Sequence, residues 1–217
     1  MTCFARLYLW ATYRLYDELA WAYDLASWLV SLGRWSGWRR RALDYVVGQR
    51  VLEVGFGTGE LLLELKTRDL EVVGLDLSPA MHRVTARKLK RQGVEIPRVC
   101  AEVQRMPFAD GWFDSIVSTF PAGYILERAT LQEVARLLCP PNPITGRPGG
   151  RFIVVGMVVT SDHWLWRWAM RLLFGAQEEG MVDRFERMAS AAGLRVQVLE
   201  EEDGGLQVPV VLASHDR

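Results

Sequence analysis

Residues 51–60 read Val-Leu-Glu-Val-Gly-Phe-Gly-Thr-Gly-Glu, and this stretch decides the fold. A short apolar run that carries an acid near its end is typical of a strand buried in a parallel sheet. Three glycines at alternate positions then precede the apolar residues 61–65, which begin a helix. Because glycine has no Cβ, a ligand can approach the backbone of such a turn, and the helix start offers it unpaired N–H groups. The stretch predicts a small-molecule site at a strand–turn–helix junction.

The composition fits one α/β domain with a short appendage. The 217 residues include 26 basic and 26 acidic side chains, and half of all residues are hydrophobic. Zero net charge does not favour a broad nucleic-acid surface, so we expect no nucleic-acid partner. The three cysteines lack metal-ligand spacing, and we expect no metal. With no signal peptide and no apolar run of about 20 residues, we expect a cytoplasmic protein.

Strand and helix patterns alternate after the opening stretch. A second buried strand ends at Asp76, and Ser78-Pro79 then supplies a helix cap and a first helical residue. Further strands are predicted at 97–102, 112–120, 151–159, 194–200 and 206–213, and helices at 60–68, 79–92, 127–138 and 178–191. This order predicts an α/β sheet that is mostly parallel and closes with a hairpin.

Two segments stand out by their aromatic content. Residues 1–47 have helical periodicity, and Gly33 and Gly37 divide them into at least two helices. We expect most of their aromatic side chains to pack on the sheet and a few to form a lid over the ligand, above all Tyr16 and Tyr23. The second segment, 161–175, is predicted to be a helical insertion. Core packing, a dimer interface and contact with a membrane surface remain open for both, so the chain is a monomer or a homodimer.

The glycine spacing argues against a dinucleotide. Dinucleotide-binding turns read GxGxxG, but the position of the third glycine holds Glu60. An acid in the first helical turn would repel a pyrophosphate bound there. Asp76 stands at the strand end where such folds bind ribose hydroxyls. A nucleoside that carries a cationic group fits these charges best.

These motifs together resemble the class I S-adenosylmethionine-dependent methyltransferases, over about residues 45–215. Residues 51–59 resemble the first motif of that family and residues 72–81 the second. Met106-Pro107-Phe108-Ala109-Asp110-Gly111-Trp112-Phe113-Asp114 is similar to a segment of the branch that includes the ubiquinone and menaquinone methyltransferases. Gly149-Gly150 resembles the turn before strand five. The resemblance implies a Rossmann-like three-layer sandwich over residues 48–217, with seven strands of which the last is antiparallel, beside the N-terminal helical lid of residues 1–47.

The resemblance also implies S-adenosylmethionine as cofactor, with S-adenosylhomocysteine as product, and it assigns roles to residues. Glu53 would hold the amino end of the cofactor, Asp76 its ribose, and Leu77 would pack on its adenine. The glycines of the turn would pass under its methionine and ribose, Glu102 and Val103 would contact the adenine edge, and Ser118 and Thr119 would face the methyl-bearing sulfur. The predicted cofactor-binding residues are Glu53, Gly55, Phe56, Gly57, Thr58, Gly59, Asp76, Leu77, Glu102, Val103, Ser118 and Thr119.

Methyl transfer depends mainly on alignment, and a general base is needed only for a protonated acceptor. His163 lies near the expected mouth of the site, although a histidine beside a Trp-rich helix is more often structural. Tyr16, Tyr23 and Tyr124 are alternative hydroxyl groups that could orient an acceptor. The aromatic segments predict a small hydrophobic acceptor, aromatic or lipid-like, such as a quinone precursor. Two other functions stay open: a non-catalytic S-adenosylmethionine-binding protein that engages a partner, and an RNA or protein methyltransferase.

Overall fold

The computed structural model describes residues 34–144, 146, 148–157, 160–161, 180–200, 202–203 and 206–215. Three predictions lie outside these residues: most of the N-terminal lid with Tyr16 and Tyr23, nearly all of the insertion 161–175, and His163 within it.

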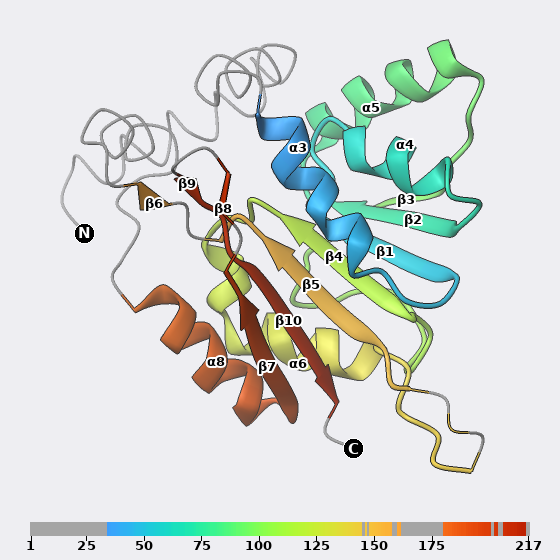
Figure 1. Cartoon of the computed structure of the whole chain (residues 1–217). Coiled ribbons are helices and arrows are strands. Elements are labelled where there is room, and N and C mark those ends of the chain that lie inside the picture. Colours follow the sequence, from blue (N-terminus) through green and yellow to red (C-terminus); the bar gives the residue numbers. More distant parts are fainter. Residues whose placement is uncertain are drawn as a thin grey trace, which may run out of the picture.

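A seven-stranded sheet forms the centre of the fold (Figure 1). Its strands are β1 (Arg50–Val54), β2 (Glu71–Asp76), β3 (Arg98–Cys100), β4 (Ser115–Thr119), β5 (Arg151–Val155), β7 (Leu194–Leu199) and β10 (Val210–His215). Their order is β3-β2-β1-β4-β5-β10-β7, and β10 runs antiparallel to both of its neighbours. The prediction of a mostly parallel sheet whose last strand is antiparallel is confirmed. The order reverses at β1, which lies between β2 and β4, and ligands of such sheets bind beyond the carboxyl ends of the strands at that point.

Helices cover both faces of the sheet (Figure 1). On one face lie α3 (Trp35–Arg40), the short 3-10 helix η1 (Arg41–Asp44), α4 (Glu60–Lys66) and α5 (Pro79–Gln92). On the other lie the 3-10 helix η2 (Gly123–Leu126), α6 (Arg128–Leu137) and α8 (Met181–Ala191). Side chains alternate along β1, so that Val51 packs in one core and Leu52 in the other. The three layers of the predicted sandwich are therefore present.

Local sequence explains where α5 begins and ends. Ser78 caps it, since its Oγ accepts a hydrogen bond from the Met81 N–H at 3.3 Å, and Pro79 is the first helical residue. Gly93 ends the helix in the left-handed conformation at φ +67°. These bounds match the predicted helix 79–92.

Gly37, by contrast, does not break the N-terminal helices as predicted, because α3 runs through it. A glycine inside a helix costs only about 1 kcal/mol, which neighbouring packing outweighs. Trp38 supplies such packing, since it is fully buried in the core that also contains the leucines of α4. The aromatic residues of α3 thus pack on the sheet domain, as expected for this end of the predicted lid.

A small second sheet, which the sequence pattern did not predict, has the order β6-β9-β8. Its strands are β6 (Thr160–Ser161), β8 (Glu202–Asp203) and β9 (Leu206–Gln207). The single strand predicted at 206–213 is therefore wrong in its bounds, because β9 and β10 divide it. Pro209 lies between them and has no N–H for a sheet hydrogen bond, which explains the interruption.

Candidate functional site

A cleft of about 800 Å³ lies at the carboxyl ends of β1 to β4, where the strand order reverses. The glycine turn, the end of β2, the segment after β3, the segment after β4 and one face of α3 all contribute to it. The lining residues are 53–58, 76–79, 101–104, 119–120 and 122–124, with Trp35, Arg39, Glu60, Leu61, Met81 and Glu127.

Gly57 is the glycine that opens the turn to the cleft. It has φ +51°, and a Cβ at this position would meet no atom within 4 Å. Its N–H donates to Asp76 Oδ2 at 2.9 Å, and its carbonyl accepts from Thr85 Oγ1 at 2.9 Å. The turn is therefore fixed from both sides while its surface stays accessible to a ligand.

The two flanking glycines meet protein atoms instead. A Cβ at Gly55 would lie 2.5 Å from the Tyr124 hydroxyl, and a Cβ at Gly59 would lie 2.5 Å from Thr85 Cγ2. Gly55 still lines the cleft, but Gly59, one of the predicted binding residues, does not. Packing against α5 and a left-handed φ of +76° both favour a glycine at position 59.

The carboxylate of Asp76 faces the glycine turn from the end of β2. Oδ2 accepts from the Gly57 N–H, and Oδ1 accepts from the Ser78 N–H at 2.8 Å. Burial raises the pKa of Asp76, and these two backbone donors oppose the change. Each carboxylate oxygen has two acceptor positions, so both can accept a further hydrogen bond from a ligand. Ser78, not Asp76, caps the following helix, so capping does not account for this acid.

Glu53 is the most unusual group of the cleft. It is only 2% exposed, and its Oε2 has no hydrogen-bond partner within the described parts of the chain. Burial raises its pKa well above the usual range, and the positive charge of Arg39 opposes this. A buried carboxylate without a partner is costly, and a cationic ligand group in the cleft would supply one.

The adenine side predicted from the sequence lies at the ends of β2 and β3. These two strands are neighbours, and Asp76 pairs with Cys100 in their register. Leu77 is 59% exposed, and Glu102 and Val103 line the same cleft. An exposed leucine at the cleft rim is an apolar surface for a planar ring.

Ser118 does not line the cleft, although Thr119 does. Ser118 is fully buried, and its hydroxyl donates to the Val54 carbonyl at 3.0 Å. Its Oγ also lies 3.3 Å from the Tyr124 hydroxyl, so Ser118 contacts a cleft residue without facing the cleft.

Aromatic rings form the wall beside the end of β4. Trp35 stacks on Phe120 with ring centroids 3.7 Å apart, and Trp38 lies behind both. Phe120 has a left-handed φ of +49°, rare for a bulky residue, and its ring lies over Gly156, where a Cβ would be 2.3 Å away. We define the aromatic wall as Trp35, Phe120 and Tyr124. The sequence pattern did not single out Trp35 or Phe120, because their stacking joins segments 85 residues apart in the chain.

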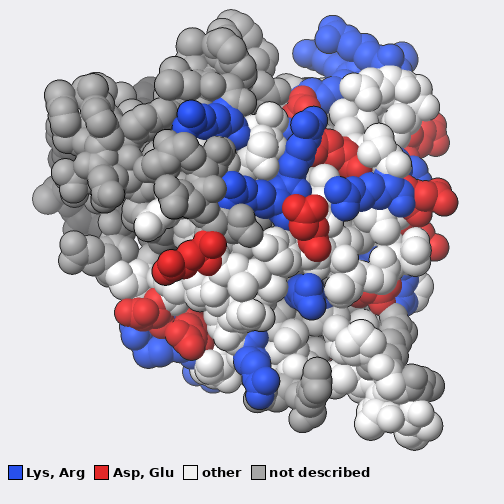
Figure 2. Space-filling model, viewed as in Figure 1, with Lys and Arg blue, Asp and Glu red and all other residues white. Residues whose placement is uncertain are grey.

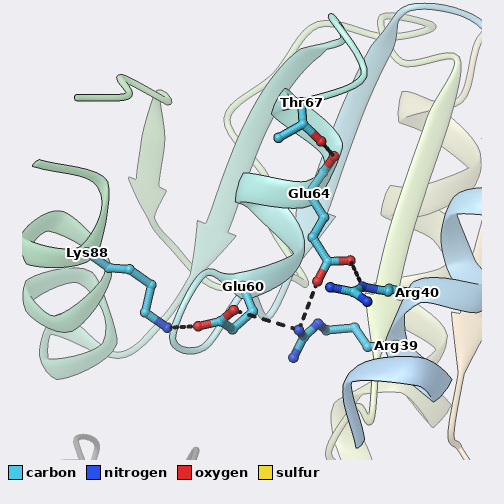
Figure 3. A network of polar contacts seen from close by, with 6 residues as sticks. All are labelled: Arg39, Arg40, Glu60, Glu64, Thr67 and Lys88. Carbon is cyan, nitrogen blue, oxygen red and sulfur yellow. Dashed lines mark hydrogen bonds and ion pairs between the residues drawn. The ribbon is translucent and has the colours of Figure 1, made fainter. Parts of the chain in front are cut away.

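Charged residues intermingle on the face of the molecule that Figure 2 shows. Glu60 at the start of α4 pairs with Lys88 of α5 and lies 3.9 Å from Arg39 (Figure 3). The predicted repulsion of a phosphate by Glu60 is therefore weakened, because two cations balance its charge.

Among the described residues that line the cleft, five are acidic (Glu53, Glu60, Asp76, Glu102 and Glu127) and only Arg39 is basic.

Neither a metal centre nor a membrane span is found within the described parts of the chain. These parts contain no cluster of three or more histidine, cysteine or acidic side chains suited to a metal ion. None of the helices placed by the structure is long and apolar enough to cross a membrane.

Residues 51–141, which supply most of the cleft, match the family model of a methyltransferase domain. A demethylmenaquinone methyltransferase of Thermus thermophilus is 35% identical over 147 residues, which cover 65% of this chain and 63% of that protein. The chain is therefore similar to the class I S-adenosylmethionine-dependent methyltransferases, as the sequence motifs indicated. This family uses S-adenosylmethionine as its cofactor.

A second relative is the demethylmenaquinone methyltransferase of Beutenbergia cavernae, 33% identical over 144 residues, which cover 64% of this chain and 55% of the relative. The chain thus spans less than two thirds of the length of either relative. Among solved structures, the YcgJ protein from Bacillus subtilis aligns with a TM-score of 0.60 and 16% identity, over 82% of this chain and 99% of its own. Geranyl diphosphate C-methyltransferase from Streptomyces coelicolor aligns with a TM-score of 0.63 and 13% identity, over 83% and 79%. At these identities the two structures support the fold.

Proposed function

We propose that this chain transfers a methyl group from S-adenosylmethionine to a small, hydrophobic, aromatic acceptor of the quinone-precursor kind. The observation that carries the proposal is a single cleft in which acids and an open backbone meet an aromatic wall. Glu53, Asp76 and Gly57 line it together with Trp35 and Phe120. The two demethylmenaquinone methyltransferases act, by their names, on demethylmenaquinone.

The residues of the cleft fit the proposed cofactor. Gly57 leaves open space where a Cβ would stand, which allows a ligand to lie against the turn. Asp76 keeps acceptor capacity for a ribose diol. The unpartnered Oε2 of Glu53 suits an ammonium group. The remaining proposed contacts come from Gly55, Phe56, Thr58, Leu77, Glu102, Val103 and Thr119, all of which line the cleft.

S-adenosylmethionine, when bound, supplies a methyl group on a positively charged sulfur, which is a good leaving group. The chain itself must then align the acceptor and keep water out, and such alignment is worth about 7–11 kcal/mol in favourable cases. Tyr124 is placed for this role. Its hydroxyl lies beside Gly55 and is contacted by the buried Ser118, which restricts where it can point. We propose Tyr124 as a residue that orients the acceptor.

Two features favour a small acceptor over RNA or protein. The cleft is lined by five acids and one base among its described residues, which does not suit a polyanion. Acidic side chains also lie among the basic ones on the described part of the face in Figure 2. We further propose that the chain works in the cytoplasm and reaches its hydrophobic acceptor at the membrane surface.

Turnover with a panel of acceptors tests the proposal. The panel holds a reduced demethylnaphthoquinone with a short isoprenoid tail, a simple phenol, a lipid amine and a short RNA, and the readouts are S-adenosylhomocysteine release and a product heavier by one methylene group. We expect turnover with the naphthoquinol alone. Tight binding of S-adenosylmethionine without any turnover would favour the non-catalytic alternative, and preferred methylation of the RNA would contradict the proposal.

A further inference from the structure

Arg39 lies on α3, outside the glycine turn and the strand ends that supply most of the cleft. Its Nη2 forms ion pairs with Glu64 at 3.2 Å and with Glu60 at 3.9 Å, as Figure 3 shows. Its side chain is only 11% exposed, and its Nε is buried without a hydrogen-bond partner among the residues that the structure describes. A guanidinium has five N–H donors in a planar fork, so Arg39 can bind a further acceptor while it keeps these ion pairs.

Arg39 shares the cleft with Glu53, the other group that has an unsatisfied buried atom. Nε of Arg39 and Oε2 of Glu53 are both without partners among the described residues, and both side chains line the cleft. The two charges interact, since the positive charge of Arg39 lowers the pKa of Glu53 and so favours its ionised form. An unsatisfied donor and an unsatisfied acceptor beside one space are complementary to a zwitterion, which carries one carboxylate and one ammonium group.

We propose that Arg39 binds the α-carboxylate of the methionine part of the cofactor, opposite Glu53 at the α-ammonium. This inference rests on the proposed function, since it concerns the same cleft. Of the described lining residues Arg39 is the only base, so a carboxylate that enters this acid-rich cleft has one cationic partner. Arg39 and Glu53 together therefore make the site specific for the methionine part of the cofactor, with both its carboxylate and its ammonium group, as well as for the nucleoside. It also connects α3, which carries Trp35 of the aromatic wall, to the bound cofactor.

Arg40 provides a matched control on the same helix. It binds the same carboxylate group, with Nε 3.0 Å from Glu64 Oε2, but its side chain is 63% exposed and does not line the cleft. Arg40→Gln thus removes a neighbouring charge and an ion pair to Glu64 without removing a cleft donor. Any loss that arises from loosening α3 against α4 should appear in both variants.

Calorimetry with S-adenosylmethionine and with decarboxylated S-adenosylmethionine, which lacks only the α-carboxylate, tests the proposal. We expect the unmodified chain to prefer S-adenosylmethionine by at least about tenfold, since a charge-assisted hydrogen bond is lost with the carboxylate. Arg39→Gln should abolish this preference, whereas Arg40→Gln should retain it. Glu53→Gln should weaken both ligands and retain the preference, because the ammonium group is common to both.

Other outcomes separate the two proposals. If the unmodified chain binds neither ligand, the proposed function itself is wrong. If it binds S-adenosylmethionine and Arg39→Gln retains the preference, the proposed function stands and the role of Arg39 is overturned. If Arg39→Gln does not fold, as judged by circular dichroism, Arg39→Lys serves instead. The single ammonium group of lysine is a poorer partner for Glu64 and the ligand carboxylate together than the planar guanidinium of arginine, so the preference for S-adenosylmethionine should fall in that variant. An unchanged preference would overturn the role of Arg39.

Discussion

A buried carboxylate lies beside each end of strand β1. Both oxygens of the one at the beginning have hydrogen-bond partners, whereas the one near the end has an oxygen without a partner among the described residues. Asp114, 5% exposed, stands at the beginning of β1 and accepts hydrogen bonds from the backbone N–H groups of Gln49 at 3.0 Å and Arg50 at 2.9 Å. The Arg50 guanidinium adds a contact of 3.1 Å to the other oxygen. Glu53, 2% exposed, stands near the end of β1 with an oxygen that has no partner among the described residues.

The pKa directions of the two acids express the same difference. Burial raises the pKa of Glu53 well above its ordinary value. For Asp114 burial acts in the same direction, but the Arg50 side chain and the two backbone donors outweigh it and hold the pKa well below the ordinary value. A satisfied buried acid stabilises the fold, whereas an unsatisfied one lowers stability and is retained where a ligand completes it. We therefore interpret the beginning of β1 as structural and its end as part of the proposed binding site.

Asp114→Ala should have the largest effect, and this effect is on stability. We expect the free energy of unfolding to fall by about 2–4 kcal/mol, because Arg50 loses its carboxylate and two backbone N–H groups lose their acceptor. Urea denaturation gives the value. Asp110→Ala is the control, since that acid is 79% exposed beside Arg136 and should contribute less than about 1 kcal/mol. Equal losses in the two variants would show that Asp114 has no special structural role.

Glu53→Gln should give the reverse pattern. We expect the free energy of unfolding to stay within about 1 kcal/mol of the original or to rise, since an unpartnered buried carboxylate is removed. The affinity for S-adenosylhomocysteine should fall by about tenfold or more, because an ammonium group loses a charged acceptor. The comparison of the two strand ends fails if Glu53→Gln destabilises the chain as much as Asp114→Ala does while calorimetry finds its affinity unchanged.

Asp76→Ala should give an intermediate result, because this acid has both backbone donors and free acceptor capacity. Loss of hydrogen bonds to a charged group predicts an affinity for S-adenosylhomocysteine weaker by about 1–3 kcal/mol. Asp76→Asn, which keeps one acceptor oxygen and the shape, should lose less. Both affinities come from calorimetry at one pH and ionic strength. An unchanged affinity in Asp76→Ala would remove the ribose assignment.

The smallest expected effect is the pH dependence of stability in the ligand-free chain. The raised pKa of Glu53 means that the folded state holds a proton which the unfolded state releases above about pH 4.3, so stability falls as pH rises from there to the folded pKa. The lowered pKa of Asp114 has the opposite sign, and its contribution is lost as pH falls below about 4. Urea denaturation from pH 4 to 8 should show that Glu53→Gln reduces the first dependence, and Asp76, whose pKa burial also raises, contributes to the part that remains. If the variant and the unmodified chain have identical pH profiles, Glu53 is not the source of this dependence.

The strands and the acids at their ends could be predicted from the sequence, because local patterns determine them. Glu53 and Asp76 follow from apolar runs that carry an acid near their ends, and α5 from its cap and its final glycine. The resemblance implied that Ser118 faces the cofactor, but the bond from its hydroxyl to the Val54 carbonyl depends on β4 lying beside β1, which no local pattern shows.

Contacts between distant segments could not be predicted in this way. Arg39 reaches the cleft because Trp38 anchors α3 in the core, and no local pattern relates this helix to Glu53. The role of Gly59 depends on Thr85 of another helix. The break in the last strand is different, because Pro209 is visible in the sequence and could have indicated it.

A crystal structure of the chain with S-adenosylhomocysteine tests the central claim most directly. We predict that the ribose hydroxyls lie within about 3 Å of the Asp76 carboxylate oxygens, with the ligand against Gly57 and its amino group at Glu53. A ligand bound outside this cleft, or inside it with the ribose away from Asp76 and the amino group away from Glu53, would contradict the account.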